Sequence, residues 1–429
     1  GFFPAVSLGW VISEEKFFPK NNIVKYLKVR GSYGEVGNDQ IGGDRFLYLP
    51  SSYGAASDSG VNKYNFGLAS NPYTSLMIVE NKIGNPDLTW EKAKKMNVGV
   101  DINLFNNCLT ASFDIFKEKR NNILANRSTS PMIIGANLPA YNFGEMENRG
   151  WEMDLNFRHH IQDFHYWARF NYSFARNEII YMDEVQKRYD YQMTTGRRKN
   201  QFFGLIFDGY YNSWEEINAL DRPKSSWSGN QLQPGDVKYI DVNQDGVIDD
   251  YDMVPIGYTP VPEIIYGFSF GAQYKGFDFS ILFQGADNVS IKYFGRSMWP
   301  FAKGEESAKS LIKERWTQER YEAGEKITFP RLSLNPNGET DHNYRPSTLW
   351  IRDASYLRLK NLEVGYTFTG GFVKRLNLNS VRLYFNGSNL FTWTDVVDLD
   401  PEAPSRSGNV EINTYPLQKV YNIGLNINF

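Results

Sequence analysis

Cysteine and histidine are rare in this sequence. Its 429 residues include one cysteine, Cys108, and four histidines, which excludes an intrachain disulfide framework and a cysteine-based zinc site. Charge of one sign is lacking too, since 46 basic and 49 acidic side chains give a formal net charge of −3. Nucleic-acid binding needs a basic patch or stripe, and this balance argues against nucleic acid as a partner.

Long hydrophobic runs are also missing. The mean hydropathy is −0.49, and no stretch approaches the ~18 apolar residues that a membrane-spanning helix requires, so helical membrane proteins are excluded. The first residues, GFFP, carry neither the charged nor the apolar region of a secretion signal. We therefore expect the chain to begin at a strand and to be part of a longer precursor.

Aromatic side chains, by contrast, are abundant. The 30 Phe, 27 Tyr and 10 Trp make up 16% of the chain, and 36 residues are glycine. Low hydropathy, many aromatic rings, much glycine and the lack of a helical span are together typical of transmembrane β-barrels.

Apolar and polar residues alternate with period two in many segments, which predicts strands with one apolar and one polar face. The clearest segments are 96–104, 109–115, 151–158, 164–174, 266–274, 277–283 and 421–429. In a barrel, the apolar faces meet lipid and the polar faces meet the lumen. The predicted lumen-lining residues are Asn97, Asp101, Glu152, Asp154, Asn156, Arg158 and Asn171.

A soluble β-sandwich would alternate as well, so the connections matter. Two connections are tight turns, at 106–107 and 275–276, whereas 40–80 and 180–260 are long. Short turns on one rim and long loops on the other are the outer-membrane pattern, and the apolar faces are dense in aromatic rings. We predict about 13 or 14 strands of roughly ten residues each. A helix-forming stretch at 305–322 predicts a short helix inside one long loop.

Several motifs occur in the order seen in one known family, the SusC/RagA-like TonB-dependent outer-membrane transporters of Bacteroidetes. The chain resembles that family along essentially its whole length. The motifs are 2–10 (FFPAVSLGW), 27–34 (LKVRGSYG), 85–91 (NPDLTWE), 142–152 (NFGEMENRGWE), 389–393 (NLFTW) and 400–402 (DPE).

The resemblance implies an all-β fold, in which residues 1–429 form the C-terminal portion of a large antiparallel transmembrane β-barrel of the 22-stranded type with long extracellular loops. It further implies that the plug domain and the first strands lie outside this chain, in an N-terminal portion. The implied location is the bacterial outer membrane, in contact with lipid.

By the same resemblance, the implied function is TonB-dependent active import of nutrients, most often oligosaccharides, with a SusD-like surface lipoprotein as lid and the TonB complex acting through the plug. The alternatives are a peptide or metal-chelate receptor, a surface-interaction barrel that transports nothing, and a soluble calcium-binding β-protein. No nucleophile–base constellation is present, and paired acids such as Glu215-Glu216 have no supporting context, so we expect no enzymatic activity.

The sharpest local motif is an acidic loop at 241–252, DVNQDGVIDDYD. Oxygen-bearing side chains stand at positions 1, 3, 5, 9 and 12 of this loop, and a glycine stands at position 6, where the chain must turn sharply. This is EF-hand-like calcium spacing, although Asp replaces the usual Glu at position 12. The alternative is a metal-free Asp/Asn/Gly turn. We predict a structural Ca²⁺ site with the ligands Asp241, Asn243, Asp245, Val247 (through its carbonyl), Asp249 and Asp252.

Loop aromatics between 202 and 227 form a second candidate site, because aromatic faces stack on sugar rings. The predicted substrate contacts are Tyr210, Tyr211, Trp214 and Trp227, with Asp208, Asn212 and Asn230 as nearby hydroxyl-binding groups. Packing within the loops or against a partner lid is an equal alternative. His159 and His160 adjoin a predicted short turn, where we expect them to be solvated.

Overall fold

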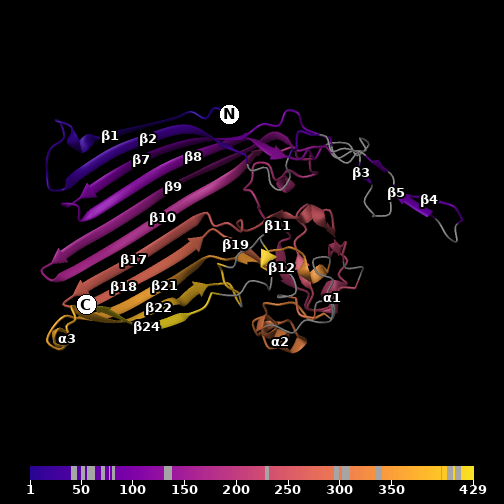
Figure 1. The fold of residues 1–429 in the computed structure, drawn as a ribbon. Helices are drawn as coiled ribbons and strands as arrows, with labels where there is room; N and C mark the ends of the chain where they lie inside the picture. Colours follow the sequence, from indigo (N-terminus) through magenta and orange to yellow (C-terminus); the bar gives the residue numbers. More distant parts are fainter. Residues whose placement is uncertain are drawn as a thin grey trace.

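Eleven strands form one antiparallel sheet that makes up most of the computed structural model (Figure 1). The strands, in sheet order, are β1 (Ala5–Val11), β2 (Val24–Asn38), β7 (Glu91–Leu104), β8 (Leu109–Ala125), β9 (Tyr141–Ile161), β10 (Phe164–Tyr181), β17 (Ile264–Tyr274), β18 (Phe277–Asp287), β21 (Tyr356–Phe368), β22 (Ser380–Thr394) and β24 (Val420–Asn428). The all-β class and the large antiparallel sheet are thereby confirmed.

The structure describes residues 1–39, 46–49, 54–55, 63–68, 73–76, 78–79, 83–129, 138–227, 231–293, 299–301, 310–333, 341–397, 399–402, 409–410 and 417–429. Within these ranges the large sheet has eleven strands, so the expected 13 or 14 was too many. The other strands of the described residues lie in the loops and are only two to four residues long. Among the described residues, no helix is long and apolar enough to cross a membrane.

The strand register keeps polar residues on one face across the sheet. Direct cross-strand partners form a continuous polar row: Lys28, Asp101, Ser112, Asp154, Asn171, Gly267, Gln284, Arg358 and Thr392. The adjacent register positions form an apolar row: Val29, Val100, Phe113, Met153, Tyr172, Tyr266, Gly285, Leu357 and Trp393. Because the side-chain period of a strand is two, these rows lie on opposite faces.

The apolar face is unusually open for a protein in water. Val98, Ile115 and Phe268 are 50%, 56% and 42% exposed, respectively. An exposed apolar surface spread over a whole sheet face would be an aggregation hazard in water but is the expected surface in contact with lipid.

The predicted tight turns are present at one end of the sheet. Phe105, Asn106 and Asn107 have φ values of 51°, 55° and 67° between β7 and β8, and Lys275 and Gly276 have φ values of 43° and 91° between β17 and β18. Asparagine and glycine adopt such left-handed conformations at little cost, which is why these residues mark the turns. A 3₁₀-helix (Ile12–Glu14) and the short helix α3 (Phe372–Arg375) serve as turns at the same end.

The long loops lie at the other end of the sheet, on the right in Figure 1. They carry the small pairs β3–β6 (Gly54–Ala55, Ile78–Val79), β4–β5 (Lys63–Phe66, Tyr73–Leu76), β11–β16 (Phe203–Gly204, Val254–Pro255), β12–β14 (Phe207–Tyr210, Val237–Tyr239) and β13–β15 (Lys224–Ser225, Val247–Ile248). The three-stranded sheet β20–β19–β23 (Ile351–Asp353, Ser290–Tyr293, Asn409–Val410) lies there too. The loop helices are α1 (Trp214–Ile217), α2 (Gln318–Glu322), η3 (Asp190–Gln192), η4 (Asp250–Asp252), η6 (Ser310–Glu314) and η8 (His342–Tyr344).

The largest cluster of buried apolar side chains lies in these loops rather than in the sheet. The 182–263 and 288–355 connections supply most of its members, which include Leu205, Val237, Tyr293, Phe329 and Trp350, each at most 2% exposed. A sheet that faces lipid on one side and a lumen on the other cannot bury its own side chains, so loop packing forms the core.

The helix expected at 305–322 is not continuous. Residues 302–309 lie outside the described residues, and the rest is split into η6 and α2. Trp316 is buried between the two and donates its backbone N–H to the Phe329 carbonyl at 2.8 Å. The side chain of Thr317 then caps α2 by accepting from the Arg320 N–H at 3.3 Å. Burial of the indole outweighs local helix propensity.

Candidate functional site: the polar face and the loop sites

The seven predicted lumen residues share the polar face. Asp101, Asp154 and Asn171 belong to the polar row itself, and Asn97, Glu152, Asn156 and Arg158 stand two or four residues from it along β7 and β9. Asp154 and Arg158 are exposed on this face. The register therefore gathers charges that are far apart in sequence onto one wall.

Two charge clusters are built into this wall. Arg30 on β2 contacts Asp101 at 3.1 Å and Asp114 at 2.6 Å, and Gly99 leaves the room for this guanidinium, since a Cβ there would lie 2.7 Å from its central carbon. Near the other edge of the sheet, Arg382 on β22 pairs with Asp278 on β18 and Glu363 on β21. Each arginine satisfies carboxylates from two neighbouring strands, so the clusters fix the strand register as well as the charge of the face.

A pocket of about 320 Å³ opens where the polar face meets the long loops. Three of its residues, Glu118, Asn148 and Asn177, are cross-strand partners on β8, β9 and β10, on the same face as the polar row. The loops contribute Arg198, Lys199, Thr259, Val261, Pro262 and Glu263. We call this cavity the rim pocket. Its lining holds acids, bases and amides, so it suits a polar ligand with groups of both charges.

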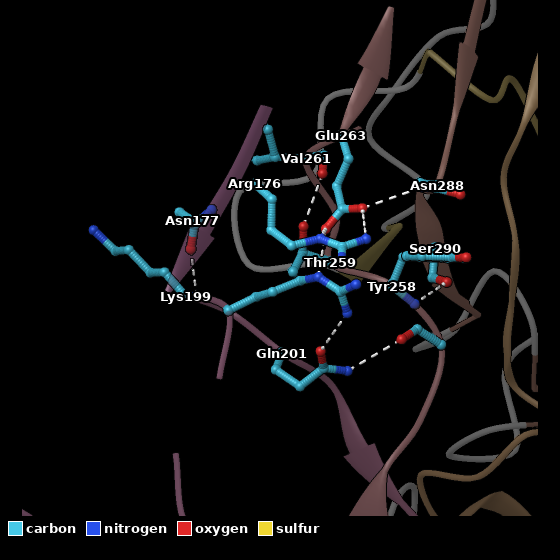
Figure 2. Close-up of polar contacts among 12 residues, drawn as sticks. Arg176, Asn177, Lys199, Gln201, Tyr258, Thr259, Val261, Glu263, Asn288 and Ser290 are labelled. Atoms are coloured by element: carbon cyan, nitrogen blue, oxygen red, sulfur yellow. Dashed lines mark hydrogen bonds and ion pairs between the residues drawn. The ribbon is translucent and has the colours of Figure 1, made fainter. Parts of the chain in front are cut away.

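Glu263 is one of the residues that line the rim pocket, and several polar side chains contact it (Figure 2). Its side chain is 3% exposed, and Arg176 binds it in a bidentate pair at 2.9 and 2.8 Å. Arg198 pairs with one carboxylate oxygen, and Asn288 donates to the other at 3.2 Å. Glu263 thus ties strand β10, the 182–263 loop and the connection after β18 to one point.

Electrostatics keep this buried carboxylate charged. Burial alone would raise the pKa of Glu263, but the hydrogen bonds and positive charges of Arg176 and Arg198 outweigh burial and lower it. The sequence analysis did not single out these residues. The basic run 197–199 (RRK) was a signal, yet nothing in the sequence placed it beside an acid 65 residues later.

The acidic loop folds onto its own backbone. The Asp241 carboxylate accepts the N–H groups of Gln244 and Gly246 at 2.7 and 2.8 Å, and Gly246 has the left-handed φ of 82° expected at the sharp turn. The side chains of Asn243, Asp245 and Asp249 accept N–H groups two residues ahead of each in the chain. Among the described residues, no group of three or more His, Cys, Asp or Glu side chains converges at metal-binding distance.

Asp252, the last predicted ligand, is 0% exposed. Its two oxygens accept from the Val242 N–H at 2.8 Å and from the Asp249 N–H at 2.9 Å, so it closes the loop. Burial is the main reason that the pKa of Asp252 is raised, with the nearby Asp241 charge acting in the same direction. The calcium assignment stays a prediction.

The predicted substrate aromatics occupy different environments. Tyr210 and Tyr211 are 8% and 7% exposed and pack inside the loops. Trp227 is half-buried, with the Arg345 guanidinium 4.1 Å from its ring centroid. Trp214 is 55% exposed at the start of α1, and Asn230 lies outside the described residues. The substrate role of these rings stays a prediction.

A wide sheet with an apolar outer face, a polar inner face, tight turns at one end and long loops at the other defines a class of protein. It is the wall of an outer-membrane transmembrane β-barrel.

The family model described as TonB dependent receptor-like, beta-barrel matches residues 1–390, and the chain belongs to this family. The SusC/RagA-like resemblance and the integral outer-membrane location are confirmed. The relatives that the chain matches are TonB-dependent receptors.

The chain is similar to several known receptors. It is 28% identical over 447 residues to TonB-dependent receptor P3 of Formosa agariphila, covering 100% of this chain and 42% of that protein. It is 27% identical over 435 residues to SusC of Bacteroides thetaiotaomicron, covering 100% of this chain and 40% of that protein. The RagAB peptide transporter has the same fold, with a TM-score of 0.71 and 23% identity over 100% of this chain and 43% of that one. The chain thus spans about two fifths of the length of these relatives.

Proposed function

We propose that the receptor to which this chain belongs imports a nutrient across the outer membrane, driven through TonB. The observation that carries the proposal is the polar row, which runs from β2 to β22 opposite the lipid-facing apolar row. Barrels of this transporter class enclose a plugged lumen, and a wall of this kind suits one. The plug and the remaining strands would come from an N-terminal portion of the receptor.

A SusD-like surface lipoprotein is the proposed lid over the long-loop end. The loops support this because they fold into a buried core of their own and so present a defined surface. Purification from membranes in mild detergent, with mass spectrometry of every chain, tests the assembly. Recovery of a plug-bearing portion and a lipoprotein supports it, and a chain that extracts alone without detergent contradicts it.

Oligosaccharides are the proposed substrate class. The resemblance to SusC-like transporters implies this class, and Trp214, with more than half of its surface exposed, is the predicted aromatic contact that a sugar ring can reach. Replacing Trp214 with alanine should then weaken uptake of an oligosaccharide that supports growth, measured with a labelled form of that oligosaccharide. Tyr211→Ala is not a matched control, because that ring is part of a buried cluster.

Peptides are the second candidate, favoured by the rim pocket. Its lining brings the half-buried Glu118 together with the exposed Lys199, so it offers a partner for each charge of a zwitterionic peptide. RagAB, which has the same fold, is a peptide transporter.

Growth of a deletion strain on single nutrient sources tests import and separates the substrates. Loss of growth on one glycan, restored by the complete receptor, supports oligosaccharide import, and the same result with a peptide source supports the second candidate. Loss only under metal limitation indicates a chelate receptor. Unchanged growth on every source contradicts import and favours a surface-interaction barrel.

We also propose that the acidic loop binds a structural Ca²⁺. The ligand spacing and the left-handed Gly246 at the sharp turn support this, because a cation relieves carboxylates gathered in one loop. The loop contacts neighbouring segments: Gln192 donates to the Asp250 carbonyl at 2.8 Å, and β13 pairs with β15. Bound calcium would therefore stiffen the 182–263 loop.

Elemental analysis of the purified receptor tests this assignment. The double substitution Asp241→Ala and Asp245→Ala should remove about one bound calcium per chain. Asp250→Ala is the matched control, because its side chain is 74% exposed and is not a predicted ligand. If the double variant keeps the wild-type calcium content, the loop is only a turn.

A further inference from the structure

Three of the four histidines lie on one hairpin. His160 and His165 are direct cross-strand partners on β9 and β10, one residue pair from the turn at 162–163. Their ring centroids are 5.5 Å apart and the ring planes differ by 24°. Both side chains are exposed, and no hydrogen bond joins either imidazole to any described residue.

His159 has a different environment. Its cross-strand partner is Tyr166, whose hydroxyl lies 3.3 Å from His159 Nδ1. Since alternate residues of a strand face opposite sides, His159 lies on the other face from His160. The pair His160–His165 lies on the same face as Asn156 and Arg158, at the short-turn end of the sheet, with the His159 ring centroid 6.1 Å from that of His160.

The separation of the two rings matches that of two imidazoles sharing one metal ion. A nitrogen ligand lies about 2.0–2.1 Å from a tetrahedral zinc ion, and the ring centre lies roughly 1.2 Å beyond the nitrogen. Two such rings at a tetrahedral angle have centres about 5 Å apart. The observed 5.5 Å needs only side-chain rotation, because both residues are exposed and their backbones are already paired.

We propose that His160 and His165 form a binding site for a divalent transition-metal ion such as Zn²⁺, Ni²⁺ or Cu²⁺ at the short-turn end of the β9–β10 hairpin. Neutral imidazole suits these ions, whereas Ca²⁺ and Mg²⁺ prefer oxygen ligands. Two protein ligands leave the other coordination positions to water. The ion joins the tips of two of the longest strands, at the end opposite the acidic loop.

Calorimetric titration of the complete receptor tests this site, using detergent-solubilised protein without a polyhistidine tag and Ni²⁺ or Zn²⁺ as the probe. The wild type should bind one ion at this site, and His160→Ala or His165→Ala should each weaken binding at least ~10-fold, since even residues that only support a metal ligand contribute that much. Mg²⁺ should give no heat from this site.

His159→Ala is the control for this pairing: its ring centroid lies 6.1 Å from that of His160, but its Nδ1 faces the Tyr166 hydroxyl and the proposal gives it no ligand role, so the affinity should stay unchanged. Asp241→Ala with Asp245→Ala should also leave it unchanged, which separates this site from the acidic loop. Wild-type protein that binds neither ion overturns the proposal. So does equal affinity in the wild type and His160→Ala, provided that circular dichroism shows the variant to be folded.

Discussion

Replacing Glu263 with alanine is the perturbation that we expect to loosen the outer rim of the polar face most. This carboxylate is nearly fully buried and is the shared partner of Arg176 and Arg198. Asn288 also donates to it, so one substitution removes contacts to three segments of the chain. The alanine variant leaves two guanidinium groups facing each other without a counter-charge.

The size of the effect follows from the burial of the partners. Breaking a buried ion pair by removing one member costs about 3–5 kcal/mol, whereas exposed pairs contribute about 0–1 kcal/mol. The side chains of Arg176 and Arg198 are 40% and 22% exposed, so water can partly rehydrate them. We therefore expect a local destabilisation of about 3 kcal/mol, at the lower end of the range for buried ion pairs.

Limited proteolysis of the 182–263 loop is the suitable assay, because the cost falls on local opening of the loop rather than on the whole barrel. When opening is fast relative to cleavage, the cleavage rate follows the open population. A change of about 3 kcal/mol should then raise the rate of loop cleavage roughly 100-fold. Asp250→Ala is the control, because its exposed carboxylate has only a 3.9 Å contact with Arg345.

A Glu263→Ala receptor that is cleaved at the wild-type rate would refute this reasoning. Glu263→Gln adds a second test, since it keeps the shape but removes the charge. If Glu263→Gln protects the loop as well as the wild type does, packing rather than the two arginines holds the rim.

Three further predictions concern the pH dependence of the Glu263 contacts, the ion pairs of Arg358 and the glycine at position 150 of strand β9. The pKa of Glu263 is lowered in the folded receptor, so the stabilisation that this carboxylate gives the loop is complete above the ordinary value of 4.5 and is lost as pH falls through the lower folded-state value. Protection of the loop from proteolysis should therefore be equal at pH 7 and pH 5. A loss of protection between those two pH values contradicts this reasoning. The side chain of Arg358 is 2% exposed and pairs with Asp400 at 2.6 Å and with Glu402 at 2.8 Å. Arg358→Met should therefore destabilise the 399–402 segment by about 3 kcal/mol, which limited proteolysis should detect as faster cleavage on the C-terminal side of residue 395. Unchanged cleavage argues against a stabilising role for these ion pairs. A Cβ at Gly150 would lie 1.9 Å from the Phe174 carbonyl oxygen, so Gly150→Ala should impair assembly of the barrel. Assembly is measured on gels as the fraction of receptor whose mobility changes on heating. Gly370→Ala is the control and should assemble normally, because a Cβ there would have no atom within 4 Å. Normal assembly of the Gly150 variant means that β9 and β10 can shift apart.

The sheet was predictable because its signal is local. Alternation with period two fixes which residues share a face, and the turn residues at 106–107 and 275–276 fix where strands reverse. Together they correctly placed Asn97, Asp101 and Asp154 on one face. The strand count was less accurate, since the large sheet has eleven strands among the described residues rather than 13 or 14.

The loop structure was not predictable in the same way. The 305–322 stretch has strong helix formers, yet Trp316 interrupts the helix to enter the loop core. Tyr210 and Tyr211 carry the residue types of a sugar site, yet both are buried among other loop side chains. Burial of large apolar rings depends on contacts between distant segments and so outweighs local preference.

Local sequence patterns were sufficient to assign the lipid-facing and polar surfaces, the positions of the turns and the spacing of the acidic loop, because each depends on neighbours within a few residues. Only the tertiary structure placed Glu263 between Arg176 and Arg198, and His160 opposite His165 within ring-contact distance. Such groupings depend on strand register and on loop closure over tens of residues. A single sequence does not encode these long-range distances in any local pattern.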